Sequence, residues 1–213
     1  RPRGRGQEVT PTPVKTAAQE AGIDRILQPE DVTDPAFAEA VAEVAPDVIA
    51  VVAYKILPPE VFTAARKGAF NLHGSLLPKY RGAAPINHAI MAGDPETGVT
   101  TFFLEPSVDT GDIILQARMS IGPNETAGSV HDRMAELGAD AVVETVRQLD
   151  AGTVETRPQD DDAATPAPKI HDADCETPWE ASAQEVHNHV RGLSPYPGAW
   201  TQHGDTRLKL YRT

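Results

Sequence analysis

Hydrophobic runs of two kinds mark the expected strands of this chain. Residues 47–54 form a continuous, β-branched run, which is typical of a strand covered on both faces of a parallel sheet. A shorter apolar run at residues 69–72 predicts a second buried strand. Further strands are expected at 98–104 and 113–121, and a weak one at 23–27.

Between these runs, apolar residues recur at the three- and four-residue spacing of amphipathic helices. The pattern predicts helices over residues 14–21, from Asp34 and Pro35 onward, from Pro85 to Gly93, and from about Thr126 to Leu149. Helices that alternate with strands predict an α/β domain. We therefore expect a Rossmann-like, doubly wound and mostly parallel sheet.

The composition of the chain changes after Gly152. Residues 153–169 are rich in Asp, Pro, Thr and Ala, which indicates a solvated linker. Ser182 and Glu185 form a capping-box pattern at the start of another helix, and alternation at 208–211 predicts a strand. The expected domains are residues 1–151, a linker at 152–172, and the start of a second, β-rich domain at 173–213.

Composition narrows the class of protein. The chain has 213 residues, of which 40% are hydrophobic, and its net charge is −12. An acidic balance argues against a general nucleic-acid binder, whose footprint is usually basic. No apolar run is long enough to span a membrane, the basic start lacks the apolar core of a signal peptide, and Cys175 is the single cysteine. We expect a cytoplasmic protein.

Asn71 and His73 are the first candidates for chemistry. They are two residues apart, so their side chains share one face of an extended strand, just before a loop at Gly74 to Pro78. Ligands of open α/β sheets bind beyond the carboxyl ends of strands. An amide donor beside a proton carrier suits a carbonyl oxygen that must take negative charge. The other interpretation is a strand-end Asn and a structural, hydrogen-bonded His.

Asp109 lies in a tight turn at residues 107–112 between two expected strands. A carboxylate beside a histidine can orient the ring or hold a water for proton transfer. Alternatively, Asp109 only closes its turn. The triplet Asp-Thr-Gly is also found in aspartic proteases, but those need two carboxylates in an all-β setting, so we reject that interpretation.

No metal site is expected. His187 and His189 are two apart on an expected helix and cannot share a face as ligands, and Cys175 has no cysteine partner. At the start of the chain, Arg1, Arg3 and Arg5 alternate with Pro and Gly in a loop. Three guanidinium groups on such a loop could meet phosphates, or the segment is a frayed terminus.

The run Asn71–Ile86, with the sequence NLHGSLLPKYRGAAPI, resembles the signature of the folate-dependent formyltransferases. The branch that acts on initiator tRNA is the most similar, and the similarity covers nearly the whole chain. Other segments agree with the family in the same order: residues 4–6, 11–15, 51–54, 93–100, 108–114 and 193–200.

The resemblance implies an activity and a catalytic triplet. The family branch transfers a formyl group from 10-formyltetrahydrofolate to the α-amine of methionine on initiator tRNA. Asn71, His73 and Asp109 fall on the family's catalytic positions. The amine would attack the formyl carbon directly, while the Asn71 amide and His73 stabilise the oxyanion and Asp109 tunes His73 or relays a proton through water.

The resemblance also implies binding residues, and we expect the protein to be a monomer. Arg1, Arg3 and Arg5 fall in a loop that faces the tRNA acceptor end, and residues 173–213 begin a C-terminal, OB-like β-barrel that assists tRNA binding. The family's first βα unit is absent from this chain. The implied folate contacts are Ser75, Leu76, Leu77 and Pro78, with Ala53, Tyr54 and Val108 as walls of the pterin slot.

Two alternatives stay open. A formyltransferase of the same fold that acts on a sugar amine or on glycinamide ribonucleotide would share the Asn-His-Asp chemistry. The arginine loop and the Pro-Tyr-Pro-Gly-Ala-Trp run at 195–200 favour the tRNA branch. The second alternative is a non-catalytic RNA-binding fragment, for which the three polar candidates would have no use.

Overall fold

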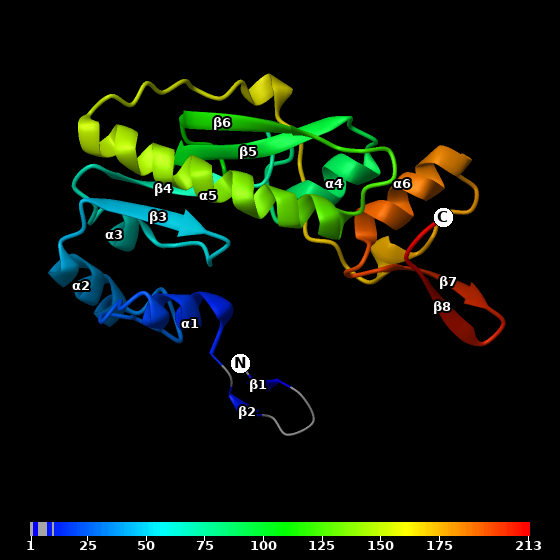
Figure 1. The fold of residues 1–213 in the computed structure, drawn as a ribbon, viewed down its shortest axis with the longest axis horizontal. Coiled ribbons are helices and arrows are strands. Elements are labelled where there is room, and N and C mark those ends of the chain that lie inside the picture. The colour runs from blue at the N-terminus through cyan, green and yellow to red at the C-terminus, as the bar shows by residue number, and fades with distance from the viewer. Residues whose placement is uncertain (1, 4–7, 10) are drawn as a thin grey trace.

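The fold is that of a computed structural model, which describes residues 2–3, 8–9 and 11–213 (Figure 1). A mixed α/β body carries a small C-terminal unit at one end. The elements are β1 (Pro2–Arg3), β2 (Glu8–Val9), α1 (Pro13–Glu20), α2 (Pro35–Val44), β3 (Val48–Val52), α3 (Pro59–Phe62), β4 (Gly68–His73), α4 (Pro85–Met91), β5 (Glu96–Phe103), β6 (Ile113–Ser120), α5 (Ala127–Ala151), α6 (Ala183–Leu193), β7 (Ala199–His203) and β8 (Thr206–Leu210).

The central sheet has four strands in the order β3-β4-β5-β6. β3 and β4 pair in parallel, whereas the β4–β5 and β5–β6 pairs are antiparallel. The α/β class is confirmed, but the expectation of a mostly parallel sheet is wrong. The segment between Phe103 and Ile113 is too short for the crossover that parallel neighbours need, so β6 must turn back along β5.

Two strand predictions near the start of the chain need correction. Residues 23–27 form no strand, and the Ile23 side chain is 54% exposed, because no neighbouring strand pairs with this segment among the described residues. β3 was expected to be covered on both faces. Val51 is its buried residue, whereas Val52, whose side chain points to the opposite face, is 50% exposed, so β3 is covered on one face only at this end.

Helix α5 covers one face of the sheet and forms the main core (Figure 1). Its buried stripe includes Val130, Met134 and Ala141, which pack with Ile90 of α4 and Val99 of β5. The helix begins with a capping box at Thr126 and ends at Gly152 in the left-handed conformation, so both expected ends are close to the observed ones. This packing fixes β4 and β5 beneath the helix.

The C-terminal unit packs against the main body through α6 and α4. The Asn87 side chain donates to the Gly192 carbonyl at 2.7 Å, and α6 shares a second small core with β7 and β8. The start of a β-barrel was expected here; within the described residues this unit contains a two-stranded sheet, and no barrel is seen. In the part of the chain that the structure describes, no helix is long and apolar enough to cross a membrane.

The connection between the two units follows the outer edge of the sheet (Figure 1, yellow). Most of its residues are exposed, yet its backbone is anchored twice. Arg157 and Ile113 exchange backbone hydrogen bonds of 2.9 and 3.0 Å at the edge of β6. Further along, Thr165 and Ala167 bond to the backbone of Arg81. We call residues 157–167 the strap.

Candidate functional site

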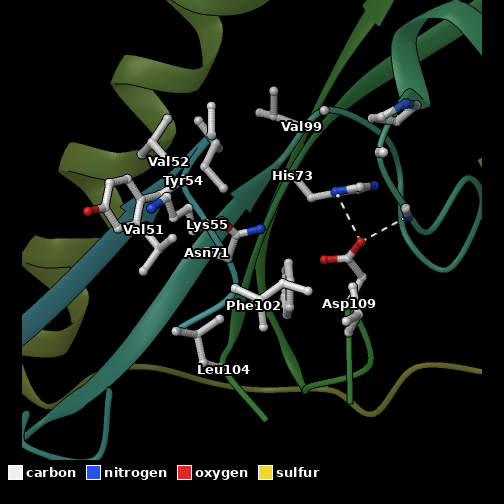
Figure 2. Close-up of a pocket in the computed structure, with 18 of the residues that line it drawn as sticks. Val51, Val52, Tyr54, Lys55, Asn71, His73, Val99, Phe102, Leu104 and Asp109 are labelled. Atoms are coloured by element: carbon white, nitrogen blue, oxygen red, sulfur yellow. Dashed lines mark hydrogen bonds and ion pairs between the residues drawn. The ribbon is translucent and has the colours of Figure 1, made fainter. Parts of the chain in front are cut away.

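A cavity of about 830 Å³ opens where β3 and β4 end (Figure 2). The segment after β3, the loop before α4, the turn between β5 and β6, and helix α5 all contribute to its lining. Most walls are apolar, and include Val52, Ile56, Phe102, Leu104 and Met134. The polar side chains of Asn71, His73 and Asp109 gather on one side. The cavity therefore combines an apolar slot with a small polar patch.

His73 is the last residue of β4 and is 5% exposed. Its Nε2 lies 2.8 Å from the carbonyl oxygen of Tyr80. A carbonyl oxygen only accepts hydrogen bonds, so this contact assigns the proton to Nε2. The other ring nitrogen, Nδ1, lies 3.6 Å from Asp109 Oδ2. Figure 2 marks this contact with a dashed line between the ring and the carboxylate.

Asp109 reaches the site from the turn between β5 and β6, and its side chain is 11% exposed. The backbone N–H of Gly82 donates to Oδ2 at 2.9 Å. The side chain of Gln159, on the strap, donates to the Asp109 carbonyl at 2.9 Å. The carboxylate therefore does more than close its own turn, because it bridges the turn to the loop before α4.

Asn71 lies two residues before His73 on β4 and lines the same cavity. In Figure 2 its amide nitrogen points to the side of the cavity where His73 and Asp109 lie. The structure thus brings the three catalytic candidates together. An amide donor, an imidazole and a carboxylate around one space can stabilise an oxyanion and move a proton.

Backbone strain is concentrated at this site. Ala53, Tyr80 and Asp109 have positive φ values of 48°, 63° and 56°. For residues with a Cβ, such conformations cost about 1–2 kcal/mol each. Ala53 and Asp109 line the cavity, and Tyr80 supplies the carbonyl that holds His73. Strain of this kind persists where the surroundings determine the backbone, and functional sites are common locations.

The candidate folate contacts fall into two groups. Ala53, Tyr54 and Val108 line the cavity. Ser75, Leu76, Leu77 and Pro78 are not among its lining residues. Their loop turns away into the protein: Ser75 Oγ donates to the Lys79 carbonyl at 2.6 Å, and the backbone N–H of Leu77 donates to Thr100 Oγ1 at 3.1 Å.

The structure says little about the three arginine candidates. Arg1 and Arg5 are outside the described residues, and for Arg3 the structure describes only the backbone in β1. Among the described residues, no group of three or more His, Cys, Asp or Glu side chains is placed to hold a metal ion.

Three residues that the sequence reasoning did not single out support the pair of His73 and Asp109. Tyr80 and Gly82 act through backbone atoms, which leave no side-chain signal in a sequence. They do stand within the Asn71–Ile86 run, so the resemblance pointed to their loop. Gln159 stands in a segment interpreted as a solvated linker, and nothing in its sequence context marks it.

An α/β body with Asn, His and Asp side chains around one cavity has the groups that a group-transfer enzyme requires. The family model described as "Formyl transferase" matches residues 1–146, and the model of the formyl transferase C-terminal domain matches residues 169–213. The chain belongs to the formyl transferase family. Curated relatives include the methionyl-tRNA formyltransferases of Chlorobium phaeovibrioides, 50% identical over 99% of this chain and 66% of the relative, and of Moorella thermoacetica, 46% identical over 99% and 68%.

The chain spans about two thirds of the length of these curated relatives. Solved structures share its fold at lower identity. HypX from Aquifex aeolicus in complex with tetrahydrofolic acid has a TM-score of 0.69 at 21% identity, over 82% of this chain and 31% of that chain. A sugar N-formyltransferase from a Shewanella species has a TM-score of 0.71 at 18% identity, over 84% and 74%.

Proposed function

We propose that this chain transfers the formyl group of 10-formyltetrahydrofolate to the α-amine of methionine on initiator tRNA. The observation that carries the proposal is the 50% identity to a methionyl-tRNA formyltransferase over 99% of the chain. The convergence of Asn71, His73 and Asp109 on one cavity supports it. The identity of the relatives supports the acceptor, and the residues of the site support the chemistry.

The reaction joins the amine nitrogen to the formyl carbon and breaks the bond from that carbon to N10 of the folate. Because Nε2 of His73 holds its proton against the Tyr80 carbonyl, Nδ1 is the nitrogen free to take the proton that the attacking amine loses. Asp109, 3.6 Å away, stabilises the resulting imidazolium. The same proton then goes to N10 as tetrahydrofolate leaves.

The tetrahedral intermediate carries a negative oxygen, which needs a donor. In this proposal the Asn71 amide donates to it, and Nδ1–H of the protonated His73 ring donates as well, both from the carboxyl end of β4. A lost donor of this kind typically costs about 3 kcal/mol of transition-state stabilisation. No covalent intermediate with the protein is required, since the amine attacks the formyl carbon directly.

The apolar slot gives the folate its place in this proposal. A pterin ring has polar atoms around its rim and broad ring faces that pack on apolar surface. The walls at Ala53, Tyr54 and Val108 offer such surface beside the polar patch. Ser75, Leu76, Leu77 and Pro78 would act through the shape of their loop, which bonds to Lys79 and Thr100. HypX, whose structure contains tetrahydrofolic acid, shares this fold and supports a folate donor.

The RNA acceptor would be held by other parts of the chain. We propose that Arg1, Arg3 and Arg5 contact the acceptor end, where guanidinium groups suit phosphates. Residues 1–151 would then be the catalytic domain, 152–172 the connection, and 173–213 the beginning of an OB-like domain that assists tRNA binding. The boundaries of the two matching family models support this division.

The test supplies 10-formyltetrahydrofolate with three acceptors: methionyl initiator tRNA, an amino-sugar nucleotide and glycinamide ribonucleotide. We expect formylation of the tRNA. The variants His73→Ala and Asp109→Ala should lose transfer by at least about a hundredfold, because each removes a group at the reacting carbon, while donor affinity stays within about tenfold.

Matched control variants are Asp112→Ala, in the same turn as Asp109, and His203→Ala, on the C-terminal hairpin. Both should keep near-normal transfer. Normal rates in either the His73 or the Asp109 variant would reject the mechanism. Formylation of one of the small acceptors alone would instead reject the proposed substrate.

A further inference from the structure

The side chain of Gln159, on the strap, lies between the two loops that hold His73 and Asp109. Its Nε2 donates to the carbonyl oxygens of Asp109 and Gly111, each at 2.9 Å. Its Oε1 accepts from Nε and Nη2 of Arg81, at 3.1 and 2.8 Å. Both amide hydrogens are used and the oxygen accepts twice, so the orientation of this side chain is fully determined.

The NH2 group of the Gln159 amide stabilises the turn that contains Asp109. Asp109 has a φ of 56°, a conformation that a residue with a Cβ adopts at a cost. A donor on its carbonyl, and a second bond to Gly111 two residues on, oppose the relaxation of the turn to an ordinary conformation. The direction of the carboxylate depends on that backbone.

The oxygen of the same amide stabilises the loop before α4. Arg81 stands between Tyr80, whose carbonyl accepts from His73 Nε2, and Gly82, whose N–H donates to Asp109 Oδ2. Anchoring the Arg81 side chain therefore fixes both neighbours. Gln159 links the supports of the imidazole to the supports of the carboxylate, although it touches neither reactive side chain.

The rest of the strap keeps Gln159 in place. On one side, Arg157 is bridged to Ile113 at the edge of the sheet. On the other side, Thr165 accepts from the backbone of Tyr80 at 2.9 Å and of Arg81 at 2.8 Å, and Ala167 donates to the Arg81 carbonyl at 2.7 Å. A residue held between two anchors can act as a rigid spacer.

We propose that Gln159 is a positioning residue for the reaction: through the strap it sets the separation and orientation of His73 and Asp109. The proposal rests on the proposed function for its kinetic consequence, but not for its structural one. A misplacement of about 1 Å at reacting groups can cost about a hundredfold in rate. Loss of this amide should therefore act on turnover more than on substrate binding.

The main variant is Gln159→Glu in the full chain. Glutamate keeps the length and the acceptor for Arg81, but it replaces the donor with an oxygen that repels the carbonyls of Asp109 and Gly111. We expect kcat for formyl transfer to fall about tenfold to a hundredfold, with KM for the folate within about threefold. Gln159→Ala removes the contacts to Arg81 and to the two carbonyls, so its kcat should fall at least as far.

Two controls match the change. Gln202→Glu makes the same substitution at an exposed amide that donates to the Gly204 carbonyl on the C-terminal hairpin. Asp161→Asn removes the negative charge of the exposed partner of Arg81 and leaves Gln159 in place. Both should keep kcat within about twofold of the parent. Thermal unfolding of every variant shows whether the fold is retained.

A spectroscopic readout separates this proposal from the proposed function. The nitrogen resonances of the His73 ring, read by long-range proton–nitrogen correlation, report its tautomer and the contact with Asp109 without any substrate. They should move in Gln159→Glu and stay in place in both controls. If they move while the parent chain formylates none of the three acceptors, the positioning role holds and the proposed function fails. Unchanged resonances and unchanged kcat in Gln159→Glu would overturn the positioning role.

Discussion

At the scale of single residues, the site depends on backbone atoms in unusual conformations. Gly82 is the clearest case, because it has a φ of 126° and its N–H donates to Asp109 Oδ2. A Cβ at this position would lie 2.6 Å from the Ala167 carbonyl oxygen on the strap. Glycine is therefore needed twice, for its conformation and for the close approach of the strap.

We predict that Gly82→Ala lowers the free energy of unfolding by about 1–3 kcal/mol and lowers kcat more than tenfold. The added methyl group must push the strap and the loop apart, which withdraws the N–H from Asp109. Denaturant unfolding and the transfer assay measure the two effects. The control is Gly152→Ala, with a φ of 68° and open space around the Cβ, which should cost stability but not rate.

The residues of the site differ in how well a sequence predicts them. Asn71 and His73 could be placed together because a strand has a period of two, so the geometry is local. Asp109 needed the resemblance, since a turn residue carries no record of what it faces. Gln159 contacts Asp109 across 50 positions of sequence, and that distance is closed only by the folded strap.

At the scale of elements, α4 and α6 pack closely because one of them carries a glycine at the contact. A Cβ on Gly192 would lie 2.6 Å from Met91 Cγ and 3.2 Å from both the Asn87 carbonyl oxygen and the Met91 nitrogen. Two of these three neighbours are backbone atoms that cannot turn aside. The interface between the main body and the C-terminal unit is thus set by backbone distance.

We predict that Gly192→Ala lowers the free energy of unfolding by about 1–3 kcal/mol, as overpacking does. The sign of this change in the free energy of unfolding is informative, because in a helix interior alanine is intrinsically more favourable than glycine by about 1 kcal/mol. Equilibrium denaturation of the parent and of Gly192→Ala measures this change. A more stable variant would mean that α6 can move away from α4 without loss.

Local signals predicted the helices better than the sheet. Thr12, Asp34, Thr126 and Ser182 all accept hydrogen bonds at the starts of their helices, and each of these starts was predicted to within about two residues. Strand direction has no local signal, so the antiparallel β4–β5 pair was missed. The short helix α3 and strand β7 were also missed, because the surrounding Pro residues dominated their segments.

At the scale of the whole molecule, a polar network joins the two units near the start of α5. Arg191 of α6 is buried and donates to the carbonyls of Gly122 and Glu125, at 3.2 and 3.3 Å. The Glu125 carboxylate accepts from the Gly122 N–H at 2.6 Å and pairs with Arg133 at 2.7 Å. Burial alone would raise the pKa of Glu125, but these partners outweigh it and lower that pKa below its usual 4.5.

A carboxyl group with a lowered pKa in the folded state contributes stability that is complete above the pKa of the unfolded chain. This stability is lost as the pH falls through 4.5 toward the lower folded-state pKa. We predict that the free energy of unfolding decreases over this acid range, and that Glu125→Gln makes the decrease smaller. Denaturant unfolding measured from pH 7 down to pH 3 tests the slope. An identical slope in both proteins would contradict the prediction.

The strap also restricts the insertions and deletions that this chain can accept during evolution. Its two anchors, at Ile113 and at Arg81, fix the number of residues that fit between them. Most surface connections accept insertions and deletions freely, but one added residue here would shift Gln159 out of register with the turn it supports. A mostly irregular stretch between the two units, whose one helical element among the described residues is a 3-10 turn at Asp161–Ala163, is thereby held to a constant length.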